Sequence, residues 1–275
     1  MSLIPRHEPV WQSRSIHLNG ADVHYQLAGP EAAAQTIVMI HGLGNDLHLW
    51  QPQVQAWAGQ YRTVCYDVFG HGQSAAFWNE ELTLEGLAQT LIELVRSLGL
   101  NSCALVGTSM GAVIALAAAH KQPQMFSHLV LCGARLHVEP AAEADVRNRA
   151  LKARQQGLEP IADVMLQRWF PAAGKSISEA QLDLVKNTFL RTSAEGYASC
   201  AQALAVYDLR PAIVAASQPM LMICGALDEE IPELMEQYAD LNAQAKLRIL
   251  QGLGHLPNWH DATLFNQELA PFLAG

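Results

Sequence analysis

The sequence predicts an α/β fold in which a mostly parallel central sheet is flanked by helices and carries an inserted helical cap. Short apolar runs alternate with helix-like segments through the first half of the chain. Beyond residue 133 this alternation stops, and four helix-like segments follow without a strand-like run. The alternation resumes near residue 219. Alternating strands and helices favour a parallel sheet, because parallel neighbours need a long crossover connection.

Seven segments are the predicted strands. Residues 23–29, VHYQLAG, show the two-residue period of a half-exposed early strand. The others are short and almost continuously apolar, as expected for strands covered on both faces. They are TIVMI (36–40), TVCYD (63–67), CALVG (103–107), HLVLC (128–132), PMLMICG (219–225) and KLRIL (246–250).

The predicted helices fall into two groups. Core helices are expected at 83–100, where leucines repeat at helical spacing, and at 110–120, 232–241 and 263–273. The four others lie at 142–158, 161–170, 178–190 and 194–207. We therefore divide the chain into a core of residues 1–134 and 212–275 and a cap of residues 135–211. An insertion leaving the end of strand 128–132 would cover the edge of the sheet where such folds bind ligands.

Composition narrows the class of protein. Of the 275 residues 50% are hydrophobic and 16% charged, enough for a substantial core, and the net charge of −9 argues against a nucleic-acid partner. No apolar run approaches the ~18 residues of a membrane span, and no secretory signal is visible at the N-terminus. Four of the five cysteines lie in strand-like runs, as small buried hydrophobes: Cys65, Cys103, Cys132 and Cys224. We expect a cytoplasmic protein without a membrane partner.

Ser109 is the candidate nucleophile. It stands between Gly107 and Gly111 in a G-x-S-x-G pattern, where the strand 103–107 becomes the helix that follows. Glycines allow a strand and a helix to approach closely at such a bend. The pattern arises by chance in roughly one chain of this size in ten, so the strand and helix around it carry the argument.

Asp228 and His255 are the candidate partners of Ser109, since each follows the end of a predicted strand. A serine hydroxyl needs an imidazole to take its proton and a carboxylate to orient that imidazole. The competing histidines are His41, His71 and His260, and His41 suits a structural role. Glu229 and Glu230 compete with Asp228, which stands nearest the strand end.

An oxyanion hole is expected from two backbone N–H groups. One belongs to Met110, directly after the candidate nucleophile, and the other to Leu43 in the glycine-rich segment HGLG after strand 36–40. The segment DVFGHGQS (67–74) is interpreted as structural, with Asp67 bonding backbone nearby.

These motifs together resemble the α/β-hydrolase superfamily. HGLG, DVFGHGQS, GTSMG, GALD and GLGH stand in that superfamily's order, including its Ser-Asp-His sequence of catalytic residues. Further segments resemble the 3-oxoadipate enol-lactonases: LWQPQV (49–54), LQRWF (166–170), EGYASCAQAL (195–204), DLRP (208–211) and HLPN (255–258).

The resemblance implies hydrolysis of a small, carboxylate-bearing enol-lactone during aromatic degradation, without a metal or organic cofactor. It implies that Arg135 holds a substrate carboxylate and that Trp169 forms a pocket wall, against the alternatives of a solvated hinge arginine and a packing tryptophan. The chain departs from that family at Phe69, where an arginine is usual, and in reading IHGLG where the family often has SNSLG.

The sequence predicts a serine esterase or lactonase that binds a small ester or lactone. Two alternatives stay open. One is a hydrolase that cleaves a C–C bond in products of aromatic ring cleavage with the same three residues. The other is a ligand receptor that keeps the fold without catalysis.

Overall fold

A single eight-stranded sheet organises the computed structural model, which describes residues 11–75, 82–172, 174–175 and 177–275. The strand order is β1-β2-β4-β3-β5-β6-β7-β8, and all neighbours from β4 to β8 pair in parallel. The predicted mostly parallel sheet is confirmed. The strands are β1 (Gln12–Leu18), β2 (Ala21–Ala28), β3 (Thr36–Ile40), β4 (Arg62–Tyr66), β5 (Cys103–Thr108), β6 (Phe126–Cys132), β7 (Met220–Gly225) and β8 (Ala245–Leu250).

The edge strand β1 is absent from the sequence prediction. It pairs antiparallel with β2, and most of its side chains are exposed, so it lacks the apolar pattern of the other strands. The turn between the two is Asn19-Gly20, and both residues have positive φ angles, 51° and 82°. An Asn-Gly pair with this backbone is the signature of a tight hairpin, which is the signal the apolar pattern could not provide.

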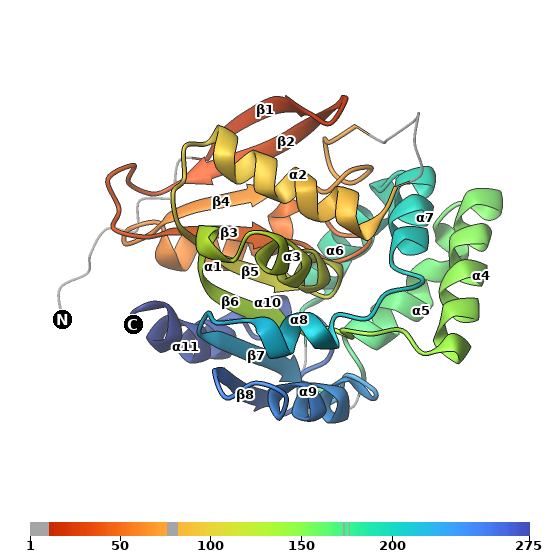
Figure 1. Cartoon of the computed structure of the whole chain (residues 1–275). Coiled ribbons are helices and arrows are strands. Elements are labelled where there is room, and N and C mark those ends of the chain that lie inside the picture. Colours follow the sequence, from red (N-terminus) through yellow and green to blue (C-terminus); the bar gives the residue numbers. More distant parts are fainter. Residues whose placement is uncertain (1–10, 76–81, 173, 176) are drawn as a thin grey trace.

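Helices cover both faces of the sheet (Figure 1). Successive residues of β3 alternate between the two layers: Val38 and Ile40 pack into one apolar core, Ile37 and Met39 into the other. The first core includes residues of α2 (Leu84–Ser97), α3 (Met110–Lys121), α8 (Arg210–Ala215) and α9 (Ile231–Ala239). The second includes residues of the 3-10 helix η1 (Leu47–Trp50), α1 (Gln51–Trp57) and α11 (Ala262–Leu273). Two short helices, η2 (Pro123–Met125) and α10 (Pro257–His260), complete this part.

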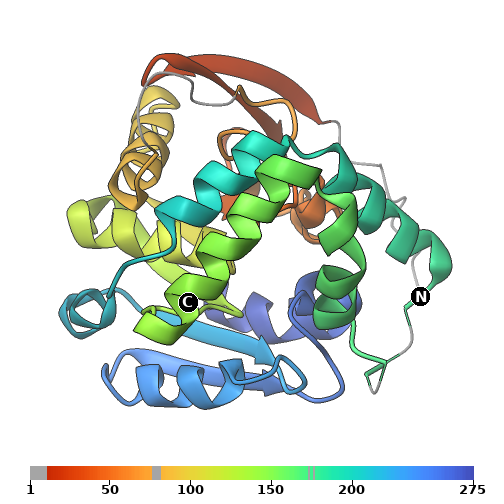
Figure 2. The same ribbon diagram turned by 90° about the vertical axis from the view of Figure 1, so that its right-hand side faces the viewer.

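Four helices between β6 and β7 form a separate layer, and we call them the cap helices: α4 (Pro140–Gln156), α5 (Glu159–Trp169), α6 (Glu179–Arg191) and α7 (Ala194–Ala203). They lie beyond the carboxyl ends of the parallel strands, and Figure 2 views them face on. A third apolar cluster joins them to the core, with Leu49, Leu256 and Trp259 on the core side. Helix α8 runs across the predicted boundary at residue 211.

Within the described ranges, no helix combines the length and apolarity needed to cross a membrane. All five cysteines are buried and free, including Cys200. Residues 1–10, in which no secretory signal was expected, lie outside the described part of the chain.

Candidate active site

Ser109 occupies the bend between β5 and α3. Its backbone has φ 52° and ψ −117°, a conformation that a residue with a side chain rarely adopts. Its N–H donates a 2.7 Å hydrogen bond to the carbonyl oxygen of Cys132 at the end of β6. The bend is therefore tied to the neighbouring strand.

The two glycines of the G-x-S-x-G pattern permit this bend by their lack of a side chain. A Cβ atom at Gly107 would overlap the carbonyl oxygen of Gly111, the second residue of α3. A Cβ atom at Gly111 would overlap the carbonyl oxygen of Ile40 at the end of β3. The close approach of strand and helix expected from the sequence is thus present.

His255 and Asp228 form a buried pair at the ends of the two last strands. Nδ1 of His255 lies 2.7 Å from Oδ2 of Asp228, and the carboxylate is fully buried. A carboxylate on Nδ1 keeps the proton on that nitrogen, which leaves Nε2 as the acceptor. The competing His260 instead accepts from Gly254 N–H and contacts the carbonyl oxygen of Lys175 at 2.6 Å.

Two buried histidines hold the loop that contains Leu43. His41 accepts a hydrogen bond from Val68 N–H (2.9 Å), and His71 accepts one from Gly44 N–H (3.0 Å). Burial lowers the pKa of both imidazoles, that of His71 to about 3. Both rings are therefore neutral at pH 7, and each donates from Nδ1 to a carbonyl oxygen, of Gly42 and Phe69 respectively.

The backbone N–H groups of Leu43, in a loop, and of Met110, the first residue of α3, are the predicted donors to an oxyanion. The N–H groups of a helix's first turn lack a partner within the helix. Among the described residues, none accepts a hydrogen bond from either Leu43 N–H or Met110 N–H. Both N–H groups are therefore unpaired among the described residues.

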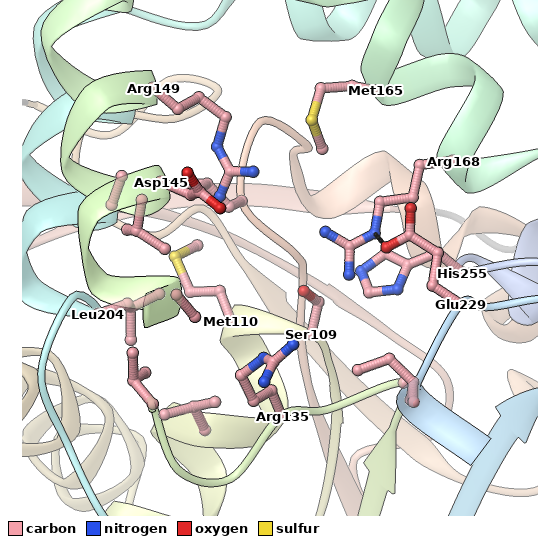
Figure 3. Close-up of a pocket in the computed structure, with 18 of the residues that line it drawn as sticks. Ser109, Met110, Arg135, Asp145, Arg149, Met165, Arg168, Leu204, Glu229 and His255 are labelled. Carbon is pink, nitrogen blue, oxygen red and sulfur yellow. Dashed lines mark ion pairs between the residues drawn. The ribbon is translucent and has the colours of Figure 1, made fainter. Parts of the chain in front are cut away.

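A cavity of about 290 Å³ unites the predicted residues (Figure 3). Six of the seven line it: Leu43, Ser109, Met110, Arg135, Trp169 and His255. The seventh, Asp228, does not line the cavity but contacts His255, which does. Figure 3 shows the Ser109 hydroxyl and the His255 ring at this space, with Arg149 of α4 on one side and Arg168 of α5 on the other.

Arg135 and Trp169, the predicted substrate contacts, have other partners as well. The guanidinium of Arg135 pairs with the carboxylate of Glu230. Trp169 is 2% exposed and packs edge-to-face on Phe189, with ring centroids 5.5 Å apart. It is thus both a core residue of the cap and part of the cavity wall.

Sequence reasoning missed two further arginines in the cavity, Arg149 on α4 and Arg168 on α5. Nε of Arg168 lies 3.2 Å from Oε2 of Glu229 and 4.0 Å from Oδ1 of Asp228. Arg168 precedes Trp169 in the segment LQRWF (166–170), and its place beside a predicted cavity residue was the signal that could have indicated it. The sequence around Arg149 gives no such signal, because the sequence pattern of a helix does not distinguish an arginine that faces solvent from one that faces a cavity.

Comparison with known proteins places the chain in a family. A family model described as "Alpha/beta hydrolase family" matches residues 37–268. 3-Oxoadipate enol-lactonase 2 of Acinetobacter baylyi is 29% identical over 86% of this chain and 87% of its own. The (E)-2-((N-methylformamido)methylene)succinate hydrolase of the same organism is 30% identical over 72% of each chain.

Solved structures agree with this placement. The enol-lactonase of Burkholderia xenovorans LB400 superposes with a TM-score of 0.88 and 30% identity, covering 95% of this chain and 100% of that one. The predicted resemblance to 3-oxoadipate enol-lactonases is thus confirmed, as is the fold. The family model spans most of the chain, and the chain belongs to the alpha/beta hydrolase family.

Proposed function

We propose that this protein is a serine hydrolase that cleaves a small carboxylic ester or lactone through an acyl-enzyme. The observation that carries the proposal is the convergence on one cavity of a strained serine, a carboxylate-oriented imidazole and two free N–H donors. Acyl transfer needs these three functions together.

In the first half of the reaction, Ser109 Oγ attacks the acyl carbon while Nε2 of His255 takes the hydroxyl proton. The carbonyl oxygen becomes an oxyanion held by the N–H groups of Leu43 and Met110, and each such donor is worth about 3 kcal/mol in the transition state. Asp228 keeps the proton on Nδ1 and stabilises the imidazolium. The C–O bond then breaks, and His255 returns the proton to the leaving oxygen.

In the second half, a water molecule replaces the leaving group. His255 takes a proton from this water, and the oxygen of the water attacks the acyl carbon. The bond between the acyl carbon and Ser109 Oγ then breaks, and His255 returns the proton to Oγ. For a lactone the leaving oxygen stays attached to the acyl chain, so one ring-opened product forms. Ser109 Oγ forms no hydrogen bond with a described residue. In unliganded enzymes such catalytic hydrogen bonds are often long, and they tighten when substrate binds. We therefore expect the hydroxyl and His255 to approach each other in the complex with substrate.

The cavity and the relatives favour a small acid as substrate. A volume of about 290 Å³ is at the lower end of ligand pockets. The two A. baylyi relatives are named for derivatives of oxoadipate and succinate, both dicarboxylic acids. We infer that the substrate is a compound resembling 3-oxoadipate enol-lactone. It would be enclosed between the core and the cap of residues 135–211. The enzyme would be cytoplasmic and would act in aromatic degradation. Arg135 and Trp169 are its proposed contacts, and the reaction requires no cofactor.

Turnover of three substrates by wild type and Ser109→Ala tests the proposal. These are 3-oxoadipate enol-lactone, p-nitrophenyl acetate and a dienol product of aromatic ring cleavage. We expect the highest kcat/KM for the enol-lactone and a loss of about 10⁶-fold in kcat on removing the hydroxyl. Turnover of the acetate alone would contradict the lactonase assignment, and efficient cleavage of the dienol would favour a C–C hydrolase.

A further inference from the structure

Among the described residues, three arginines line the cavity, and two of them form ion pairs. Arg168 forms an ion pair with Glu229, and Arg135 forms one with Glu230. Arg149 has no ion pair within the described part of the chain, and its Nε is buried without a hydrogen-bond acceptor. In Figure 3 its side chain extends from α4 into the cavity. A cationic group left in this state is costly unless a ligand completes it.

Tyr197 on α7 adds a second unsatisfied group beside this arginine. Its side chain is fully buried, and its hydroxyl makes no hydrogen bond with a described residue. Burial raises the pKa of this phenol, and the nearby charges of Arg149 and Arg168 act in the opposite direction. Arg149 thus lies beside the hydroxyl. Tyr197 does not line the cavity, so it suits a role in orienting Arg149.

The unpaired charge of Arg149 favours an anionic ligand, and one carboxylate of the cavity opposes it. Asp145, one turn earlier on α4, also lines the cavity but lies outside ion-pair distance of Arg149. Its exposed carboxylate competes with an anion for Arg149. Ser109 lines the same cavity as Arg149 of α4, so a small substrate can contact both.

We propose that Arg149 determines specificity by binding a carboxylate at the end of the substrate remote from the scissile bond, with Tyr197 as its positioning residue. This assignment rests on the proposed function. It moves the acid-binding role from Arg135, whose charge Glu230 balances, to Arg149 on the cap helix α4. A guanidinium binds a carboxylate by two parallel hydrogen bonds, which fixes both the position and the orientation of the acyl chain.

Two esters with the same leaving group test this proposal. Mono-p-nitrophenyl glutarate carries a terminal carboxylate, and p-nitrophenyl pentanoate is its neutral counterpart. We expect wild type to prefer the acidic ester and Arg149→Gln to lose about 10- to 100-fold in kcat/KM for it, mainly through KM. The loss of kcat/KM in the same variant should be much smaller for the neutral ester than for the acidic one. Arg149→Lys should retain part of the preference.

Further variants separate this role from a structural one. Arg147→Gln is the matched control, because Arg147 lies on the same helix but is exposed and paired with Glu143. It should leave both esters unaffected. Tyr197→Phe should raise KM for the acidic ester more than for the neutral one. Asp145→Asn should lower KM for the acidic ester.

Three results would overturn the assignment while leaving the proposed function intact. They are Ser109-dependent turnover without preference for the acidic ester, an equal loss on both esters in Arg149→Gln, and loss of the preference in Arg135→Gln but not in Arg149→Gln. If neither ester shows Ser109-dependent turnover, the proposed function itself fails.

Discussion

At the scale of single residues, the site depends on a strained backbone held by its neighbours. A non-glycine residue with φ 52° costs about 1–3 kcal/mol. The hydrogen bond from Ser109 N–H to Cys132 and the packed start of α3 offset that cost. In this conformation Ser109 lines the cavity.

The pair His255–Asp228 gives the first prediction. In Asp228→Asn the amide cannot hold the proton on Nδ1, so we expect kcat to fall by about 10⁴-fold with an unchanged circular dichroism spectrum. Glu229→Gln should lower kcat far less, because the Glu229 carboxylate faces Arg168 and not His255. Similar losses in the two variants would contradict the assignment of the acid.

Sequence reasoning succeeded where position along the chain determines position in the fold. Ser109, Asp228 and His255 each follow a strand, and the ends of parallel strands meet at one edge, so their proximity is predictable. Arg149 reaches the cavity, and Tyr197 lies beside Arg149, from cap helices whose packing angles no local pattern encodes.

At the scale of elements, the cap helices are joined to the core through an apolar cluster. Phe189 on α6 is fully buried in it and makes edge-to-face contacts with Trp169 and Tyr197, at centroid distances of 5.5 and 5.7 Å. Since Trp169 and Arg168 are neighbours on α5, this packing also places a wall of the cavity. The cap is therefore part of the site's geometry.

Phe189→Ala tests this role of the cap. Deleting a buried phenylalanine side chain costs about 3–5 kcal/mol, so we expect a lower urea midpoint and a raised KM. Leu184→Ala on the same helix is the control, because Leu184 is 43% exposed and its truncation should change stability by less than about 0.5 kcal/mol. An unchanged KM in Phe189→Ala would show that the cavity forms independently of this packing.

At the scale of the whole molecule, buried neutral histidines make stability depend on pH. His71 has a pKa of about 3 in the folded protein against 6.5 for an exposed imidazole. Between these values the unfolded chain binds one more proton than the native state, so stability falls as the pH falls from about 6.5 toward 3. Burial lowers the pKa of His41 too, so it acts in the same direction.

We expect His71 alone to lower the free energy of unfolding by about 2 kcal/mol between pH 7 and pH 5. Urea titrations of wild type and His71→Gln at both pH values measure this contribution. The variant should be less stable at pH 7, because Gly44 N–H loses its acceptor, but should show a shallower pH dependence. Equal slopes in wild type and His71→Gln would contradict the burial of a neutral ring.

The central claim is that Ser109 forms the acyl-enzyme, and covalent trapping tests it most directly. Wild type is treated with a fluorophosphonate, digested and mapped by mass spectrometry. The account predicts a single phosphonylated serine, Ser109, whose labelling is slowed by 3-oxoadipate enol-lactone and abolished in Ser109→Ala. Labelling of another residue, or an active enzyme in which Ser109 stays unmodified, would contradict it.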